Sequence, residues 1–595
     1  MSKIFSRWPA TVVLLIAGLP ILAGGQQPSP VPSTPEKQGG SATAPDEGIP
    51  VTDADVVKAC GGCHIRDDKQ RMTRISYRRA TPENWELTIR RMISLNKAQV
   101  SPDVARRVIK SLSDSHGLAP EEARPIMFDA ERRLVDFRYS ADMETNDLCR
   151  RCHSIGRVLS ERRTRDEWNG LIAMHRYYYP GVDGGSGGFR RGGPPGAGRG
   201  AVPAGRGRAG DTGRGNESQQ PVDRALARLI ADFPLMSQEW TAWSAAMRTP
   251  RLAGRWALAG YEIGKGPVYG QVTISDRPDV ADSFLTEGRF VYAKGGQIVN
   301  RRSRGIVYTG FQWRGRSADT PDDPGTWREV AFIERNGQEI KGRWFTGGHN
   351  ETGIDVTLRR VSNDPLVSGT DVVSLKSSTS AQRVRIYGVN LPERIAATDI
   401  DFGQGIRVSR VVSTSPELIA IDVDVAADAR VGPRDLSLAG STRPSAIVVY
   451  SRMDAIRVTP QAGMARLGGV TFPIRKEQFE ARGVSNGPDA KPGTPDDLDL
   501  GPVDASWSLE EYPATFKDDD VKFVGEIGPG GLFVPTMEGP NPKRSGNRNN
   551  VGDVWVVASY TPQGADPAAR PMRARAHLLV TVPVYMDWDS REVGR

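Results

Sequence analysis

Two short stretches decide how this sequence is read: CGGCH at residues 60–64 and CRRCH at residues 149–153. Together they hold all four cysteines of a 595-residue chain that has only six histidines. C-x-x-C-H is the attachment sequence of a c-type haem, in which two thiols bind the porphyrin edge and the histidine binds the iron. A lone redox pair or half a zinc site explains one copy but not two. The residues predicted to hold two covalent haems are Cys60, Cys63 and His64 for the first, and Cys149, Cys152 and His153 for the second.

An internal repeat follows the motifs and predicts the second ligand of each iron. Residues 79–92 align without gaps with residues 162–175 at an offset of 83, which places Met92 opposite His175. A haem iron with one histidine ligand is completed by His, Met or an open position. The predicted pairs are His64 with Met92 on the first iron and His153 with His175 on the second, with Trp85 and Trp168 packed against the two porphyrins.

Other ligands stay open at this point. Met72, Met174 and His116 lie in the same region, and Met174 adjoins His175, so an error of one residue in the alignment would exchange them. Two protein ligands on each iron leave no open position, which argues against peroxidase or oxygen chemistry. Because Met/His ligation raises the potential relative to bis-His ligation, we expect electrons to pass from the second haem to the first.

The start of the chain has the features of an exported protein. Lys3 and Arg7 precede an apolar stretch over residues 9–23, and small residues follow, which is typical of a signal peptide over residues 1–25. Residues 26–50 contain almost no large apolar side chains and are predicted to be a disordered linker. We therefore expect the protein in a bacterial periplasm. A net charge of +8 is modest for this length and does not indicate a nucleic-acid-binding protein.

Helical patterns predict an all-α dihaem cytochrome c domain over residues 51–248. A Gly/Arg-rich tract at 181–220 interrupts it, and we read this tract as a disordered insertion rather than a nucleic-acid-binding tail. The helix signals are N-caps at Thr52 and at Thr145 or Asn146, and helices over Pro102–Ser113, from Pro120 to about Val135, and over Pro221–Met247.

The remaining sequence alternates with period two and predicts three β domains. A β-barrel is expected over residues 250–362, an immunoglobulin-like β-sandwich over 366–450 and a C-terminal β-sandwich over 453–595. The acidic loop at 487–499 has carboxylates that suit Ca²⁺, although a solvated loop is the simpler reading. The strands expected in the barrel are Val268–Ile274, Phe284–Ala293, Gly305–Trp313, Trp327–Glu334, Glu339–Phe345 and Ile354–Arg360.

The combination of a signal peptide, two C-x-x-C-H motifs within about 90 residues and three β domains resembles the α subunit of quinohaemoprotein amine dehydrogenase. The stretch LGGVTFPIRKEQFEARGVSNGPDAKPGTPDDLDLGPVDASWSLEEYPATFKDDD at 467–520 is also similar to this family. The tract at 181–220 is a departure from the family pattern. The resemblance implies one His/Met and one bis-His haem.

The resemblance also implies a periplasmic αβγ complex that oxidises primary amines. Its quinone, cysteine tryptophylquinone, would belong to a small γ subunit beside a β-propeller β subunit. This chain would take electrons from the quinone and pass them to a soluble blue copper protein or cytochrome c. The four cysteines here are already assigned to haem, which agrees with a quinone on another chain. The alternatives are a dihaem cytochrome that serves another periplasmic dehydrogenase, or a haem-containing binding or sensor protein.

Overall fold

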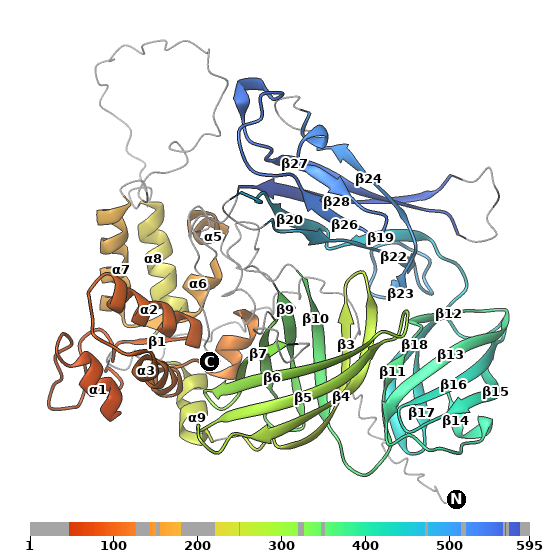
Figure 1. Cartoon of the computed structure of the whole chain (residues 1–595), viewed down its shortest axis with the longest axis horizontal. Coiled ribbons are helices and arrows are strands. Elements are labelled where there is room, and N and C mark those ends of the chain that lie inside the picture. The colour runs from red at the N-terminus through yellow and green to blue at the C-terminus, as the bar shows by residue number, and fades with distance from the viewer. Residues whose placement is uncertain are drawn as a thin grey trace, which may run out of the picture. The chain divides into compact units, whose positions relative to one another are not determined.

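The computed structural model describes residues 47–126, 143–149, 155–179, 182, 220–248, 250–318, 327–346, 352–470, 474–512, 519–562, 566 and 570–582. The chain divides into two compact units (Figure 1). One consists of Asn363–Arg457 and Arg482–Val503, and the other contains the remaining described residues. Within the described ranges, no helix is long and apolar enough to cross a membrane.

The N-terminal domain is helical, as predicted, with one short two-stranded sheet (Figure 1). Polar caps start several of its helices: the Asp53 side chain accepts from the Val56 amide, and Thr164 accepts from the Glu167 amide. The elements are α1 (Ala54–Cys60), β1 (Arg78–Ala80), α2 (Pro82–Ser94), α3 (Pro102–Ser115), α4 (Pro120–Ala123), a 3₁₀ turn (Arg124–Ile126), α5 (Met143–Cys149), α6 (Ile155–Leu159), β2 (Glu161–Arg163), α7 (Arg165–Tyr178), α8 (Pro221–Asp232) and α9 (Gln238–Ala246).

Some helix boundaries differ from the prediction. The cap of α1 is Asp53 rather than Thr52, and α5 already includes Thr145 and Asn146. The helix from Pro120 ends at Ala123 because Pro125 cannot donate a backbone hydrogen bond.

The helix predicted over Pro221–Met247 is two helices. Helix α8 ends before Phe233-Pro234, and Ser237 caps α9 with a 3.1 Å bond from the Trp240 amide. Pro234 cannot continue a helix, which explains the break.

The predicted barrel is a closed eight-stranded antiparallel barrel in which each strand pairs with the next and β10 pairs with β3 (Figure 1). The strands are β3 (Gly254–Glu262), β4 (Gly266–Asp276), β5 (Ser283–Tyr292), β6 (Ile298–Tyr308), β7 (Gln312–Ala318), β8 (Trp327–Ile333), β9 (Glu339–Thr346) and β10 (Thr352–Arg360). The strand predicted over Gly305–Trp313 was wrong. Thr309 and Gly310 have positive φ angles of 55° and 72°, and they make the turn between β6 and β7.

The next segment forms two four-stranded sheets, β11-β13-β16-β15 and β12-β18-β17-β14, around one apolar core. The immunoglobulin-like class stays a prediction. The strands are β11 (Leu366–Thr370), β12 (Ser374–Lys376), β13 (Thr379–Val389), β14 (Ile400–Asp401), β15 (Ile406–Thr414), β16 (Leu418–Val425), β17 (Gly432–Leu438) and β18 (Ser441–Tyr450).

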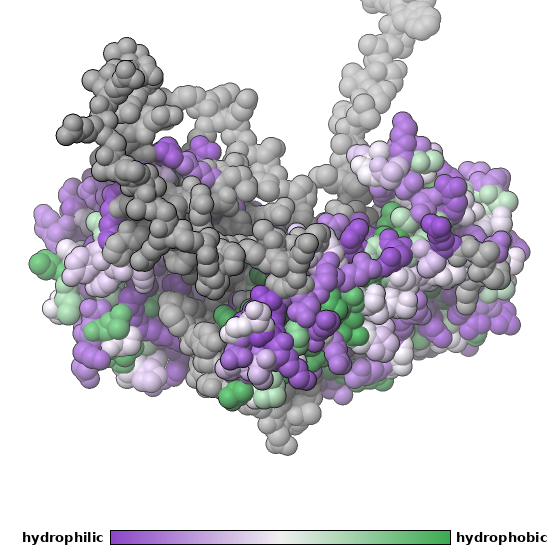
Figure 2. All heavy atoms as spheres, turned by 90° about the horizontal axis from the view of Figure 1, so that it is seen from above, coloured by the Kyte–Doolittle hydropathy of each residue, from purple (hydrophilic) through white to green (hydrophobic). Residues whose placement is uncertain are grey.

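The last described strands form three sheets, β19-β22-β23, β20-β28-β27-β24 and β21-β26-β25. On the face shown in Figure 2, hydrophilic side chains cover much of the described surface and hydrophobic ones are scattered. The strands are β19 (Ala455–Thr459), β20 (Ala462–Arg466), β21 (Glu477–Gln478), β22 (Glu480–Ser485), β23 (Leu498–Pro502), β24 (Ser506–Glu511), β25 (Gly525–Ile527), β26 (Leu532–Pro535), β27 (Gly552–Tyr560) and β28 (Met572–Thr581).

Candidate functional site

The first C-x-x-C-H motif continues the last turn of α1. The amides of Cys63 and His64 both donate to the carbonyl oxygen of Cys60, at 3.1 and 2.9 Å. Cys60 is half-buried against the domain core and Cys63 is exposed, and neither is in a disulfide. Burial and the neighbouring Cys63 raise the pKa of the Cys60 thiol. The two thiols therefore lie one turn apart at a helix end, as thioether attachment requires.

A hydrogen bond to the backbone holds the ring of His64. Its Nδ1 donates to the carbonyl oxygen of Thr73 over 2.8 Å, which fixes the tautomer and leaves the Nε2 lone pair for a metal. The loop that supplies this carbonyl is held by a 3.0 Å bond from the Thr73 amide to Ile65 and by the ion pair of Arg71 with Asp67. These residues fit a haem bound through Cys60, Cys63 and His64.

The second motif is described only at its start. Cys149 ends α5 as Cys60 ends α1, and it is half-buried against a second apolar cluster. Cys152 and His153 lie outside the described residues. Their roles stay predictions from the sequence.

The two predicted distal ligands occupy the same position on equivalent helices. Met92 on α2 is half-buried, and its Sδ lies 3.6 Å from Nδ2 of Asn96. His175 on α7 is half-buried too, and its Nδ1 donates to the carbonyl oxygen of Leu171 over 2.8 Å, which again leaves Nε2 available. The positions suit the predicted roles, and the ligation itself stays a prediction.

Among the alternative ligands, His116 has other partners. It is fully buried, its Nδ1 lies 2.8 Å from the Ser115 hydroxyl and its Nε2 lies 3.4 Å from the Ile49 carbonyl oxygen. Burial lowers its pKa to about 4, so it is neutral at pH 7. Met72 is fully buried in the core that contains Cys60, and Met174 is half-buried. We therefore regard His116 as a structural histidine.

The predicted repeat is confirmed in the fold, and it is longer than the sequence alignment indicated. Trp85 and Trp168 are both buried, and each indole N–H donates to the backbone carbonyl at a helix end: Trp85 to His116 after α3, and Trp168 to Phe233 after α8. The amides of Ala80 and Arg163 donate to the same two carbonyls. Helix α8 is thus the counterpart of α3.

Sequence reasoning missed this wider repeat because its offset changes along the chain. Asp55 of α1 pairs with Arg107 of α3, and at the equivalent positions Glu144 of α5 pairs with Arg224 of α8. The offset is 89 for α1 and α5, 83 for α2 and α7, and 117 for α3 and α8. The Gly/Arg-rich tract accounts for the last increase. The shared spacing from Arg107 to Leu118 and from Arg224 to Leu235 was the available signal.

The short strands β1 and β2 join the two copies about a local two-fold axis. Their antiparallel register pairs Arg78 with Arg163, Arg79 with Arg162, and Ala80 with Glu161. Arg79 and Arg162 are counterparts in the repeat, so the axis passes between them. The domain therefore consists of two similar halves, each with one C-x-x-C-H motif.

Comparison with known families supports this reading. Four family models of the quinohemoprotein amine dehydrogenase alpha subunit match the chain: haem binding over residues 51–189, domain II over 249–361, domain III over 373–451 and domain IV over 456–593. The chain belongs to the quinohemoprotein amine dehydrogenase alpha subunit family.

Beyond the family models, the comparisons found only weak similarity. Among curated proteins, no sequence matches. A redesigned beta barrel bound to DFHBI is 14% identical over 18% of this chain and 94% of that chain, with a TM-score of 0.16. Mouse Cadherin-23 EC22-24 is 12% identical over 44% of this chain and 77% of that chain, with a TM-score of 0.14.

In this alpha subunit, one buried carboxylate pairs with both Arg79 and Arg162, the arginines on either side of the local two-fold axis. Glu122 of α4 accepts from Nη1 and Nη2 of Arg79 at 2.7 and 2.9 Å, and Nε of Arg162 lies 3.3 Å from it. Burial alone would raise the pKa of Glu122, but the hydrogen bonds from Arg79 and the charge of Arg162 lower it to about 2. The carboxylate is therefore ionised at neutral pH.

A second buried ion cluster lies on the same pair of strands. Glu161 accepts from Arg78 over 2.6 Å and from Arg163 over 2.8 Å. Burial opposes ionisation, yet the charges of Arg163 and Arg78 lower the pKa of Glu161 to about 2. The guanidinium groups of Arg78 and Arg163 lie over the rings of Trp85 and Trp168, at 4.9 and 5.7 Å from the ring centroids. Each of the two tryptophans thus has one arginine guanidinium over its ring, supplied by the paired strands.

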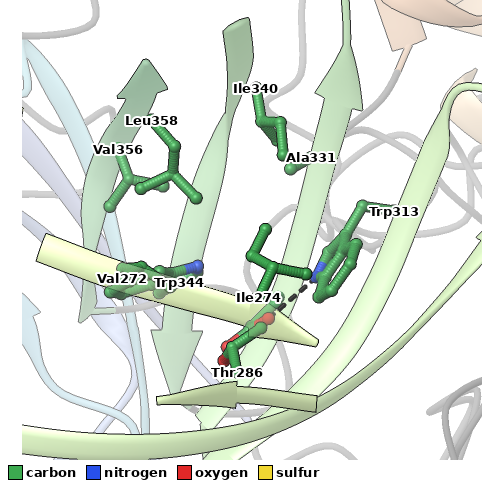
Figure 3. Close-up of a pocket in the computed structure, with 10 residues that line it drawn as sticks. Val272, Ile274, Thr286, Trp313, Ala331, Ile340, Trp344, Val356 and Leu358 are labelled. Atoms are coloured by element: carbon green, nitrogen blue, oxygen red, sulfur yellow. Dashed lines mark hydrogen bonds between the residues drawn. The ribbon is translucent and has the colours of Figure 1, made fainter. Parts of the chain in front are cut away.

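The family's domain II contains a small cavity inside the barrel (Figure 3). It has a volume of about 20 Å³, room for about one water molecule. Its one charged lining residue, Glu329, accepts from the Trp313 indole over 2.8 Å, and burial raises its pKa. Trp344 and Leu358 close the apolar side.

The acidic loop uses its carboxylates internally. Asp496 accepts from the Asp489 amide over 3.1 Å and Asp497 accepts from the Gly493 amide over 2.7 Å. Within the described part of the chain, no group of three or more His, Cys, Asp or Glu side chains is arranged to hold a metal ion.

Proposed function

We propose that this chain is the electron-transfer subunit of a periplasmic amine dehydrogenase and carries two covalent c-type haems. The observation that supports this most directly is the position of the motifs. One C-x-x-C-H begins at the end of α1 and the other at the end of α5, in the two halves of a duplicated fold. A family whose model is described as haem-binding covers both.

Each bound haem would supply one-electron transfer between Fe(III) and Fe(II). The chain's own residues would hold it: Cys60 and Cys63 by thioethers, and His64 through Nε2, with the ring fixed by Thr73. Met92 and His175 would be the distal ligands of the two irons. The hydrogen bond at Nδ1 also raises the basicity of the ring, which strengthens its bond to the metal.

The electrons would come from a quinone on another subunit. All four cysteines of this chain lie in the haem motifs, so none is left to cross-link a tryptophan. We propose that cysteine tryptophylquinone belongs to a small γ subunit beside a β-propeller β subunit, and that a blue copper protein or soluble cytochrome c accepts the electrons.

The test is to express the full chain, including residues 1–50, with a cytochrome maturation system and to count haems by the pyridine haemochrome assay. Two haems per chain are expected, and none or one would contradict the proposal. Added to its partner subunits, the chain should show haem reduction when a primary amine is supplied. Two haems without amine-dependent reduction would favour a dihaem cytochrome that serves another dehydrogenase.

A further inference from the structure

One of the two buried charge clusters between the two halves is formed by Arg79, Glu122 and Arg162. The side chains are 0%, 6% and 8% exposed, so solvent screens their charges poorly. Two guanidinium groups share one carboxylate, which leaves one net positive charge inside the domain.

The cluster is built into the fold from both halves. Besides Glu122, the Arg79 guanidinium donates to the backbone carbonyls of Gly117 and Leu235, at 3.0 and 2.5 Å. Gly117 follows the end of α3, and Leu235 follows the end of α8, the equivalent helix of the second half. Arg162 donates to the Leu159 carbonyl over 2.7 Å. The arginines are therefore held in place by backbone groups on both sides of the axis.

The carboxylate is held as firmly as the arginines. Glu122 also accepts from the Ala119 amide over 2.9 Å and from the Ser237 hydroxyl over 2.9 Å. At the equivalent position after the N-cap of α9, the second half has Trp240 in place of a carboxylate. One carboxylate therefore serves both arginines, and the positive excess at the axis is a consequence of this asymmetry.

The effect of this charge on the haem potentials depends on its position relative to the two halves. Points on a two-fold axis are equally far from corresponding points of the two halves, and Cys60 and Cys149, the first cysteines of the two motifs, end corresponding helices. A fixed positive charge favours the reduced form of a nearby iron, because reduction adds an electron. A charge on the axis must act on both irons alike, while axial ligands act on one.

We propose that the Arg79–Glu122–Arg162 cluster sets the potentials of the two haems together, without changing the difference between them. This inference rests on the proposed function, since it needs two haems. The cluster would place the pair between the potentials of the electron donor and the electron acceptor. The difference between the haems would be left to their distal ligands.

The experiment is redox titration of the purified full-length holoprotein, followed by absorbance to resolve two midpoint potentials. Glu122→Gln removes a negative charge and should raise both potentials by similar amounts. Arg162→Gln removes a positive charge and should lower both potentials. It keeps the two hydrogen bonds between Arg79 and Glu122. Arg162→Lys retains the charge and should stay close to the wild type.

The matched control is Glu144→Gln, the same chemical change on α5 at an exposed ion pair with Arg224. It should move neither potential appreciably, because solvent screens an exposed charge. A structural role alone would lower the thermal midpoint without moving the potentials in opposite directions.

Two results would overturn the inference: unchanged potentials in Glu122→Gln and Arg162→Gln, or a shift confined to one haem. If Glu122→Gln fails to retain haem, Arg162→Gln and Arg162→Lys decide the question. A wild-type chain without two haems would refute the proposed function instead, and would be recognised before any variant is measured.

Discussion

Arg79 of β1 lies directly opposite Arg162 of β2, its own counterpart in the internal repeat. An antiparallel pair of strands that matches a residue with its counterpart has a two-fold axis between the two. The helices on either side then repeat the same contacts, as Trp85 with the His116 carbonyl and Trp168 with the Phe233 carbonyl show. This relationship makes the haem-binding domain a pair of similar halves.

Replacing Met92 by Ala tests the ligand assignment. The far-red methionine–iron band should disappear from the low-temperature absorption spectrum, and the potential of the first haem should fall. The bis-imidazole signature in magnetic circular dichroism should stay. If both signals persist, the alignment that places Met92 over the first iron is wrong.

Replacing Glu161 by Gln should destabilise the haem-binding domain by about 3–5 kcal/mol at pH 7, because it leaves Arg78 and Arg163 without their buried carboxylate. The pKa of Glu161 is lowered from 4.5 to about 2, so its contribution is present above pH 4.5 and is lost as the pH falls toward 2. Urea unfolding at pH 7 and pH 3 should show a smaller difference between variant and wild type at pH 3. An equal difference at both values would contradict the assignment.

The two tryptophans of the repeat should respond alike to mutation. Trp85→Phe and Trp168→Phe each remove an indole N–H that donates to a backbone carbonyl, at 3.0 and 3.1 Å. Each carbonyl keeps a backbone donor, the amide of Ala80 or of Arg163, so the loss of one hydrogen bond should cost about 0.5–1.5 kcal/mol. Urea unfolding should show a similar loss for both, and a loss confined to one would show that only that tryptophan depends on its bond.

Two glycines of the barrel offer a matched pair. A Cβ at Gly342 would lie 2.2 Å from the Val330 carbonyl oxygen, whereas the nearest atom to a Cβ at Gly288 is a methyl group of Val272 at 3.5 Å. Gly342→Ala should therefore destabilise the barrel by about 1–3 kcal/mol. Gly288→Ala should be close to neutral in the same thermal unfolding measurement. Equal effects would mean that β8 and β9 are less closely packed than described.

Glu329 inside the barrel should make stability fall as the pH rises. Burial raises its pKa above the ordinary 4.5, so its full contribution is present below pH 4.5 and decreases as the pH rises through the raised value. Glu329→Gln keeps an acceptor for the Trp313 indole and should remove this dependence. Thermal midpoints measured from pH 5 to pH 9 would check it, and an unchanged slope would contradict it.

Much of the fold was accessible from sequence because its signals are local. The gapless alignment of residues 79–92 with residues 162–175 matched α2 with α7, and period-two patterns located six regions of the barrel. The turn at Thr309 and Gly310 was missed, since the residues on both sides are equally apolar and read as one strand. The start of α8 at Pro221 was predicted, but its pairing with α5 depends on contacts between segments 80 residues apart, as Glu144 and Arg224 illustrate.

In the candidate site too, local sequence signals predicted some residues, and contacts between distant segments determine the others. Cysteine spacing identified Cys60, Cys63 and His64, but the sequence holds no signal that Thr73 orients the His64 ring. The buried clusters around Glu122 and Glu161 were missed as well, because arginine-rich stretches are usually solvated and only the paired strands bring these charges inside.

The pairing of β1 with β2, in which Arg79 lies opposite its own counterpart Arg162, bears on the origin of the protein. Two separate copies of one half would make the same antiparallel contact, each presenting Arg79 to its twin. A single-haem ancestor that assembled as a homodimer, and whose gene was later copied in tandem, would give this arrangement directly. The later insertion of the Gly/Arg-rich tract into the second copy would then have shifted the alignment of the two halves and hidden part of the repeat in the sequence.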